Sequence, residues 1–114
     1  MEQSKPYLRH VRVSDLIEEE LSKIMLKEVE LQPNTLATIT EVVVTKKLDQ
    51  AKVYLSVIPS EQSEKLVETL NKRSKYLGAL LLRKLNIRPL PQLTFVEDHG
   101  NENAADIEKA LLDS

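Results

Sequence analysis

Residue types that define several common classes of site are scarce or absent in this 114-residue sequence. Cysteine is absent, which excludes a disulfide scaffold, a thiolate zinc site and a cysteine nucleophile, and which fits a reducing compartment. Gly78 and Gly100 are the two glycines, too few for a glycine-rich phosphate loop. No apolar run approaches the roughly 20 residues of a membrane-spanning helix. The whole chain is 41% hydrophobic and 30% charged, a composition typical of one globular domain.

Charge is distributed unevenly along the chain, although the formal net charge is only −2. No aspartate or glutamate occurs between Thr69 and Val96. The basic residues of this stretch are Lys72, Arg73, Lys75, Arg83, Lys84 and Arg88. An acid-free basic stretch in a near-neutral chain indicates a local anionic partner. The alternative is a solvated helix face that happens to lack acids.

Hydrophobic spacing predicts three helices and three strands in the order α-β-β-α-α-β. The predicted segments are residues 12–25 (helix), 37–45 and 51–57 (strands), 61–72 and 77–85 (helices) and 93–96 (strand). Helices must cover one face of a three-stranded sheet to build a core, so the fold class is α+β. The two predicted helices lie between the second and third strands in the chain, so the third strand can pair with the hairpin only through a long crossover connection. Residues 102–112 have the spacing of a short terminal helix.

Local signals refine these elements. Ser14 is expected to cap the first helix, with Asp15, Glu18 and Glu19 in its first turns, and Ser60 is expected to cap the second. In the first strand, Ile39 has the opposite parity to Val42 and Val44. Either a bulge near Glu41 or burial on both faces explains that switch.

No arrangement of an active site is visible. The two histidines, His10 and His99, lie in polar sequence and are expected to be exposed. Adjacent side chains such as those of residues 97–99 point in different directions, so they indicate a metal site only weakly. We therefore expect no enzyme, no catalytic residue, no metal and no cofactor.

The basic stretch lies where two helical patterns meet, and this place favours an anionic ligand. The first backbone amides of a helix point outwards and attract anions, and Lys72, Arg73 and Lys75 add positive charge beside them. A phosphate backbone fits such an array. Aromatic residues are few and Phe95 is expected in the core, so backbone contacts to structured RNA are favoured over base stacking.

Four strings, in order and at matching spacing, resemble the ribosome-binding factor A family. Residues 12–25 (RVSDLIEEELSKIM) are similar to the family's first helix. Residues 36–57 (LATITEVVVTKKLDQAKVYLSV) follow its strand, turn and second strand. Residues 80–98 (LLLRKLNIRPLPQLTFVED) match the family in the spacing of Leu81, Leu85, Ile87, Arg88, Pro91, Leu93, Phe95 and Asp98. Residues 106–112 (DIEKALL) look like the family's closing helix.

This resemblance implies a type II KH-like RNA-binding domain in residues 1–98, followed by an acidic tail in residues 99–114. In ordinary KH domains a GxxG loop joins two helices, whereas this family resembles a helix–kink–helix with an Ala-x-Gly interruption. That interruption falls on residues 73–75, which contain neither alanine nor glycine. We expect a bend near Ser74, and the alternative is one merged helix.

The resemblance also implies a non-catalytic assembly factor of the small ribosomal subunit. It would bind immature 30S particles and 16S rRNA during late maturation, as a cytoplasmic monomer that matters most in the cold. The residues expected at the RNA interface are Lys72, Arg73, Ser74, Lys75, Arg83, Lys84 and Arg88, assisted by Arg9, Arg12, Lys46 and Lys47. The alternative function is a KH-like protein-interaction module whose basic strip binds an acidic protein partner or the chain's own tail.

Overall fold

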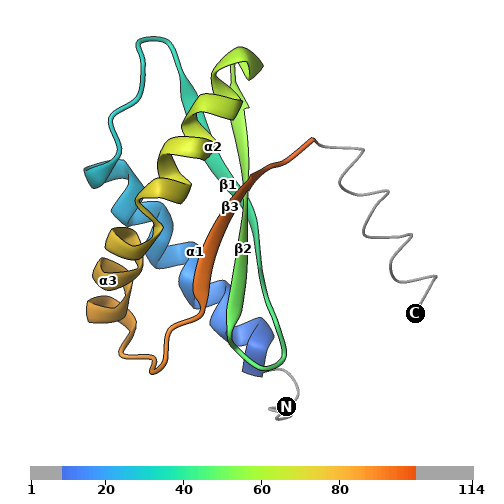
Figure 1. Cartoon of the computed structure of the whole chain (residues 1–114), viewed down its shortest axis with the longest axis vertical. Coiled ribbons are helices and arrows are strands. Elements are labelled where there is room, and N and C mark those ends of the chain that lie inside the picture. The colour runs from blue at the N-terminus through green and yellow to red at the C-terminus, as the bar shows by residue number, and fades with distance from the viewer. Residues whose placement is uncertain (1–8, 100–114) are drawn as a thin grey trace, which may run out of the picture.

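The computed structural model describes residues 9–99, in which three α-helices and three β-strands follow the predicted order (Figure 1). The elements are α1 (Arg9–Glu28), β1 (Leu36–Val44), β2 (Gln50–Ile58), the short 3-10 helix η2 (Ser60–Gln62), α2 (Ser63–Lys72), α3 (Ser74–Leu85) and β3 (Gln92–Glu97). The predicted α+β class is confirmed. The terminal helix predicted for residues 102–112 lies outside the described residues. No helix within residues 9–99 has the length and apolar character needed to cross a membrane.

The sheet has the order β1-β2-β3, with an antiparallel β1–β2 hairpin and a parallel β2–β3 pair. A parallel neighbour requires a long crossover, which α2 and α3 supply. Gln92, at the start of β3, lies opposite Gln50, and its backbone N–H donates to the Asp49 carbonyl over 3.0 Å. The connection between α3 and β3 therefore ends beside the hairpin turn.

A β-bulge in β1 explains why apolar residues at both odd and even positions of this strand are buried on one face. The register shifts between Ile39 and Glu41, so Thr40 is the extra residue. Ile39, Val42 and Val44 all become buried on the face that the helices cover, whereas Val43 is 43% exposed. The predicted bulge is confirmed, and burial on both faces is wrong.

All three helices pack on one face of the sheet and enclose a single core. The largest side chains sealed in it are Ile17, Leu21, Leu55, Leu70, Leu77, Leu81 and Phe95. Leu16, which has helical spacing with the core positions of α1, is instead 39% exposed. His10 is half-buried rather than exposed, and His99 is exposed as expected.

The role predicted for Ser14 is wrong. The helix α1 begins at Arg9, so Ser14 lies in its second turn, and the first turn contains no acid. The buried Ser14 hydroxyl donates to the His10 carbonyl over 2.8 Å and accepts the Val44 N–H over 3.1 Å. A serine inside a helix often bonds back to the carbonyl four residues earlier. Here its oxygen also ties α1 to the last residue of β1.

Ser60 is likewise not a side-chain cap. It begins η2, and α2 starts three residues later at Ser63 without a side-chain hydrogen bond at its start. The Gln62 N–H donates to the Pro59 carbonyl, and the Ser63 N–H donates to the Ser60 carbonyl. The 3-10 turn therefore gives these first amides backbone partners, which removes the need for a side-chain cap.

Candidate nucleic-acid interface

The helical stretch after Ser63 is interrupted at Arg73, between α2 and α3. Arg73 has φ −101° and ψ 11°, outside the helical range, and its N–H is shared between the Thr69 and Leu70 carbonyls. The expected bend near Ser74 is confirmed one residue earlier, and one merged helix is wrong. The break forms without the family's Ala-x-Gly, so other contacts must hold it.

Two side chains beside the break anchor it to neighbouring elements. The Asn71 side chain accepts a hydrogen bond from the Phe95 N–H over 2.7 Å and donates one to the Phe95 carbonyl over 2.9 Å. It thus bonds to the backbone of the edge strand β3 in the way a neighbouring strand would. Arg73 donates from Nη1 to the Glu28 carbonyl, at the last residue of α1, over 3.0 Å. A cation is favourable there because the last carbonyls of a helix lack intrahelical partners.

Tyr76 completes the contact with α1. Its hydroxyl donates to Glu28 Oε1 over 3.0 Å, and the Arg73 guanidinium lies 5.1 Å from the centre of its ring. The hydrogen bond to Glu28, together with the charge of that carboxylate, raises the pKa of Tyr76 above its ordinary value. Nothing local in the sequence predicts this arrangement, because Glu28 and residue 73 are brought together only by the fold.

The cations predicted around the junction are thus used in different ways. The Arg73 side chain is turned towards α1, whereas Lys72 and Lys75 are exposed. Lys72 has only a distant ion pair, 4.0 Å from Glu68. Ser74 is half-buried at the start of α3.

A larger group of predicted cations gathers at one end of the molecule, the lower end in Figure 1. The first turns of α1 and the hairpin turn meet there through the Ser14–Val44 hydrogen bond. The connection after α3 joins them through the bond from Gln92 to Asp49. We call the exposed cations of these segments and of the last turn of α3 the basic end: Arg9, Arg12, Lys46, Lys47, Arg83, Lys84 and Arg88. Of these, Lys84 also lines a small groove with Glu20, Lys23 and Lys27 of α1.

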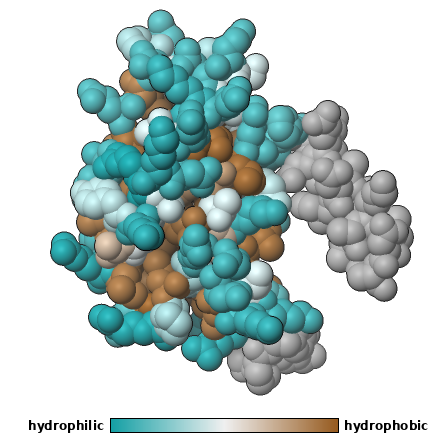
Figure 2. Space-filling model, viewed as in Figure 1, coloured by the Kyte–Doolittle hydropathy of each residue, from teal (hydrophilic) through white to brown (hydrophobic). Residues whose placement is uncertain are grey.

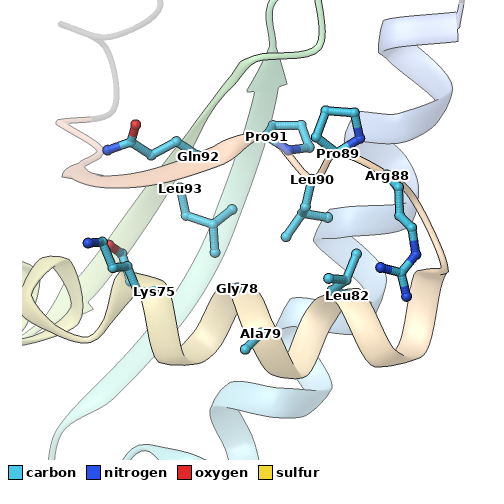
Figure 3. Close-up of a pocket in the computed structure, with 11 residues that line it drawn as sticks. Lys75, Gly78, Ala79, Leu82, Arg88, Pro89, Leu90, Pro91, Gln92 and Leu93 are labelled. Carbon is cyan, nitrogen blue, oxygen red and sulfur yellow. The ribbon is translucent and has the colours of Figure 1, made fainter.

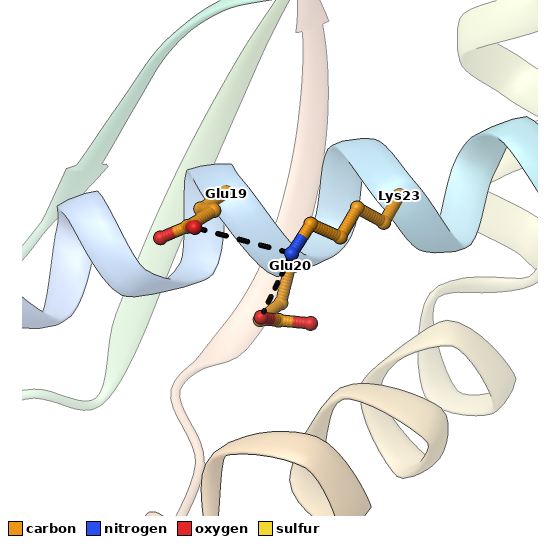
Figure 4. Close-up of polar contacts among 3 residues, drawn as sticks. All are labelled: Glu19, Glu20 and Lys23. Atoms are coloured by element: carbon orange, nitrogen blue, oxygen red, sulfur yellow. Dashed lines mark ion pairs between the residues drawn. The ribbon is translucent and has the colours of Figure 1, made fainter.

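The basic end keeps most of its charge. Asp15 and Asp49 are the only carboxylates on its segments, residues 9–15, 45–50 and 83–91. Within the described part of the chain, none of the seven cations forms an ion pair within 4.0 Å. Lys23 is different, because it lies 3.9 Å from Glu19 and 3.6 Å from Glu20 on the same helix (Figure 4).

A groove of about 580 Å³ connects the junction with the basic end. It runs between α3 and the connection that leads to β3, with Lys75 near one end and Arg88 near the other (Figure 3). Leu82 and Leu90 line it, and no carboxylate does. Apolar atoms framed by hydrophilic ones are visible over this lower part of the molecule in Figure 2. The groove thus offers an apolar floor between two cations.

The opposite end of the molecule is acidic. Figure 1 places there the α1–β1 connection, η2 and the start of α2. We call the carboxylates of residues 28–36 and 59–65 the acidic end: Glu28, Glu30, Glu61 and Glu64. Lys65 is the one cation of these two segments. Charges of opposite sign therefore predominate at the two ends of the molecule.

The fold and its charges define a small α+β protein with a broken helix beside a parallel edge strand and one cationic end. The family model described as "Ribosome-binding factor A" matches residues 9–111. A ribosome-binding factor A from Chlorobaculum parvum is 41% identical over 107 residues, which cover 91% of this chain and 88% of that protein. The chain belongs to the ribosome-binding factor A family, as the sequence resemblance indicated.

Solved structures show the same fold. The crystal structure of ribosome-binding factor A from Thermus thermophilus gives a TM-score of 0.68 at 22% identity, covering 77% of this chain and 94% of that chain. A homology model of Thermus thermophilus ribosome-binding factor A has also been fitted into the cryo-EM map of a 30S–RbfA complex. That structure gives a TM-score of 0.57 at 24% identity, covering 75% of this chain and 94% of that chain.

Proposed function

We propose that the protein is a non-catalytic assembly factor that binds immature small ribosomal subunits and 16S rRNA during late maturation. The observation that carries this proposal is the basic end, where seven exposed cations come from three chain segments that contain only two carboxylates. The family supports it, and so does the 30S complex of the Thermus thermophilus protein. Residues 1–98 would form the RNA-binding domain, of the KH-like type, and would act in the cytoplasm.

Binding at this end would be mainly electrostatic. The seven cations are exposed and unpaired within the described residues, so meeting phosphates would cost them no internal ion pair. Contacts to phosphates fix position and orientation without reading sequence, and RNA helices are recognised largely by shape. The protein would therefore recognise a folded region of rRNA rather than a short base sequence.

The groove beside α3 would extend this interface towards the junction. Lys75 and Arg88 stand near its two ends, where they would contact phosphates of the same RNA segment. Lys72 is exposed beside the break and would add a further contact. Arg73 would act differently, by holding the junction against α1 so that its neighbours stay in place.

The salt dependence of binding to purified 16S rRNA tests the proposal. Each phosphate neutralised contributes roughly 0.7 to 0.9 to the slope of log affinity against log salt. Replacing Arg12 and Lys47 by glutamine should therefore lower that slope by about 1.4 to 1.8. The matched comparison uses single variants: Arg12→Gln should lower the slope by about 0.7 to 0.9, whereas Lys65→Gln, which removes the same charge at the acidic end, should leave it unchanged.

Two results would count against the proposal. Equal slopes for Arg12→Gln and Lys65→Gln would show that the basic end is not the RNA interface. A negligible slope for the unchanged protein would favour the alternative function, a module held to a protein partner by apolar contacts.

A further inference from the structure

The helix α3 has a second groove on its other side. This groove, of about 270 Å³, lies between α1 and α3, whereas the groove of Lys75 and Arg88 lies between α3 and the connection to β3. Three of its four charged lining residues are cations, so positive charge flanks α3 on both sides. The four are Glu20, Lys23 and Lys27 of α1 and Lys84 of α3.

The one carboxylate of this groove is balanced within α1. The Lys23 ammonium nitrogen lies 3.6 Å from Glu20 and 3.9 Å from Glu19 (Figure 4). Lys27 and Lys84 are exposed and, among the described residues 9–99, neither forms an ion pair within 4.0 Å. Two ammonium groups from two helices are therefore free to bind an anion beside the groove, and lysine commonly binds phosphate.

No other carboxylate opposes an anion at α3. Glu28, the remaining acid in the second half of α1, does not line the groove. It accepts the Tyr76 hydroxyl and lines a separate pocket with Arg73. α3 itself, residues 74–85, contains no aspartate or glutamate. Phosphates on either side of α3 would therefore meet an excess of positive charge.

The surface of α3 between the two grooves faces solvent. Tyr76, Ala79 and Arg83 are exposed there, and their spacing of three and four residues places them on one face of the helix. A helix with its side chains is about 10–12 Å across. Double-helical RNA presents a wide, shallow minor groove with a backbone along each edge. A helix flanked by cations on both sides matches that groove, whereas an unpaired strand has a single backbone.

We propose that α3 lies along the minor groove of a double-helical rRNA segment, with one phosphate backbone on each side. Lys75 and Arg88 would contact one backbone, and Lys27 and Lys84 the other. Arg83, on the exposed face between them, would donate to the 2′-hydroxyl groups that the minor groove displays. This mode of binding rests on the proposed function and adds to it the form of the RNA and a contact from Lys27.

The salt dependence of binding to purified 16S rRNA tests the α1 side of this contact. Lys27→Gln should lower the slope of log affinity against log salt by about 0.7 to 0.9, because one phosphate contact is lost. The matched control, Lys65→Gln, removes the same charge from an exposed lysine of α2 and should leave the slope unchanged. An unchanged slope for Lys27→Gln, with a lower slope for Arg12→Gln, would overturn this inference alone. Unchanged slopes for both would contradict the proposed function itself.

Directed hydroxyl-radical cleavage of 16S rRNA tests the form of the RNA. Because the chain has no cysteine, Leu26→Cys and Ala79→Cys each provide one attachment point for an iron chelate. Both positions are exposed, the first beside Lys27 and the second in the groove of Lys75. The two chelates should cut opposite strands of the same double helix, with Glu64→Cys at the acidic end as the background control. Cuts confined to unpaired strands, or cuts from Ala79→Cys alone, would overturn the inference.

Discussion

The two ends of the molecule carry opposite charge, although the same α1–β1–β2 unit contributes to both. At one end, the start of α1 and the hairpin turn bring Arg12 and Lys47 together. At the other, the α1–β1 connection provides Glu30 and η2 provides Glu61. Because α1 and both strands run the length of the domain, residues far apart in the chain meet at one end. Charge segregation here is a property of the fold rather than of one stretch of sequence.

The contiguous basic stretch is therefore divided in space. α3 has 12 residues, and at 1.5 Å per residue it separates its two ends by about 18 Å. Lys72 and Lys75 lie at the junction, whereas Arg83 and Lys84 lie in the last turn of α3 and Arg88 lies three residues beyond its end. One phosphate cannot contact both groups, but one RNA segment along the groove between them can.

Charge reversal should affect RNA affinity far more at the basic end than at the acidic end, and this difference should be the largest of the effects predicted here. Arg12→Glu with Lys47→Glu should weaken binding to 16S rRNA by at least about 100-fold, since hydrogen bonds to charged groups contribute roughly 1.5–3 kcal/mol each. Glu61→Lys with Glu64→Lys at the acidic end should change it less than about twofold. Filter binding at fixed salt measures both. Equal effects would mean that overall charge, and not its position, governs binding.

Removing the hydroxyl of Ser14 should have the next largest effect, this time on stability. Ser14→Ala leaves the buried Val44 N–H without its partner, which should cost about 1–3 kcal/mol of unfolding free energy. Urea denaturation measures the loss. Ser22→Ala, also within α1 but with no part in this bond, provides the control. A loss below about 0.5 kcal/mol would show that the hydroxyl does not hold α1 to β1.

Substitutions of Arg73 and Lys72, two neighbouring cations at the junction, should have different effects, the first on stability and the second on RNA affinity. Arg73→Gln removes the bond to the Glu28 carbonyl and should lower stability by about 1–2 kcal/mol. Lys72→Gln removes only an exposed, distant ion pair, worth about 0–1 kcal/mol, and should mainly reduce RNA affinity. Thermal unfolding and RNA binding of both variants, measured side by side, test the division. The reverse pattern would make Arg73 a phosphate contact and Lys72 a structural residue.

Deleting residues 100–114 should have the smallest effect. This segment carries four carboxylates and one lysine, and we expect it to screen the basic end against stray RNA. Its removal should raise the affinity for unrelated RNA a few-fold, measured at low salt against 16S rRNA as the reference. A deletion protein that binds unrelated RNA as weakly as the full chain would show that the segment has another role.

Local patterns in the sequence predicted most of the fold. The period of the leucines in α3, the β-branched run of β1 and its change of parity at Glu41 are all set by near neighbours in the chain. These features predicted the helices, the strands and the bulge. The bend near Ser74 came from the family resemblance, and the structure shows what holds it: Asn71 on β3 and Arg73 on α1.

What the sequence could not show depends on contacts between distant residues. A serine near the start of a helix is usually a cap, and only the position of Val44 gives Ser14 its actual role. In the same way, Lys46 and Lys47 were expected merely to assist. The bond from Gln92 to Asp49 and the Ser14 contact bring these lysines, Arg88 and the start of α1 to one end. Charge counted along the chain therefore located only part of the candidate interface.

Site-specific photocrosslinking to immature small subunits tests the central claim most directly. The photoreactive residue replaces Lys47 at the basic end in one protein and Glu64 at the acidic end in the other, both exposed positions. We expect strong crosslinks from position 47 to 16S rRNA and none above background from position 64. Equal RNA crosslinks from both positions, or RNA crosslinks from position 64 alone, would contradict it.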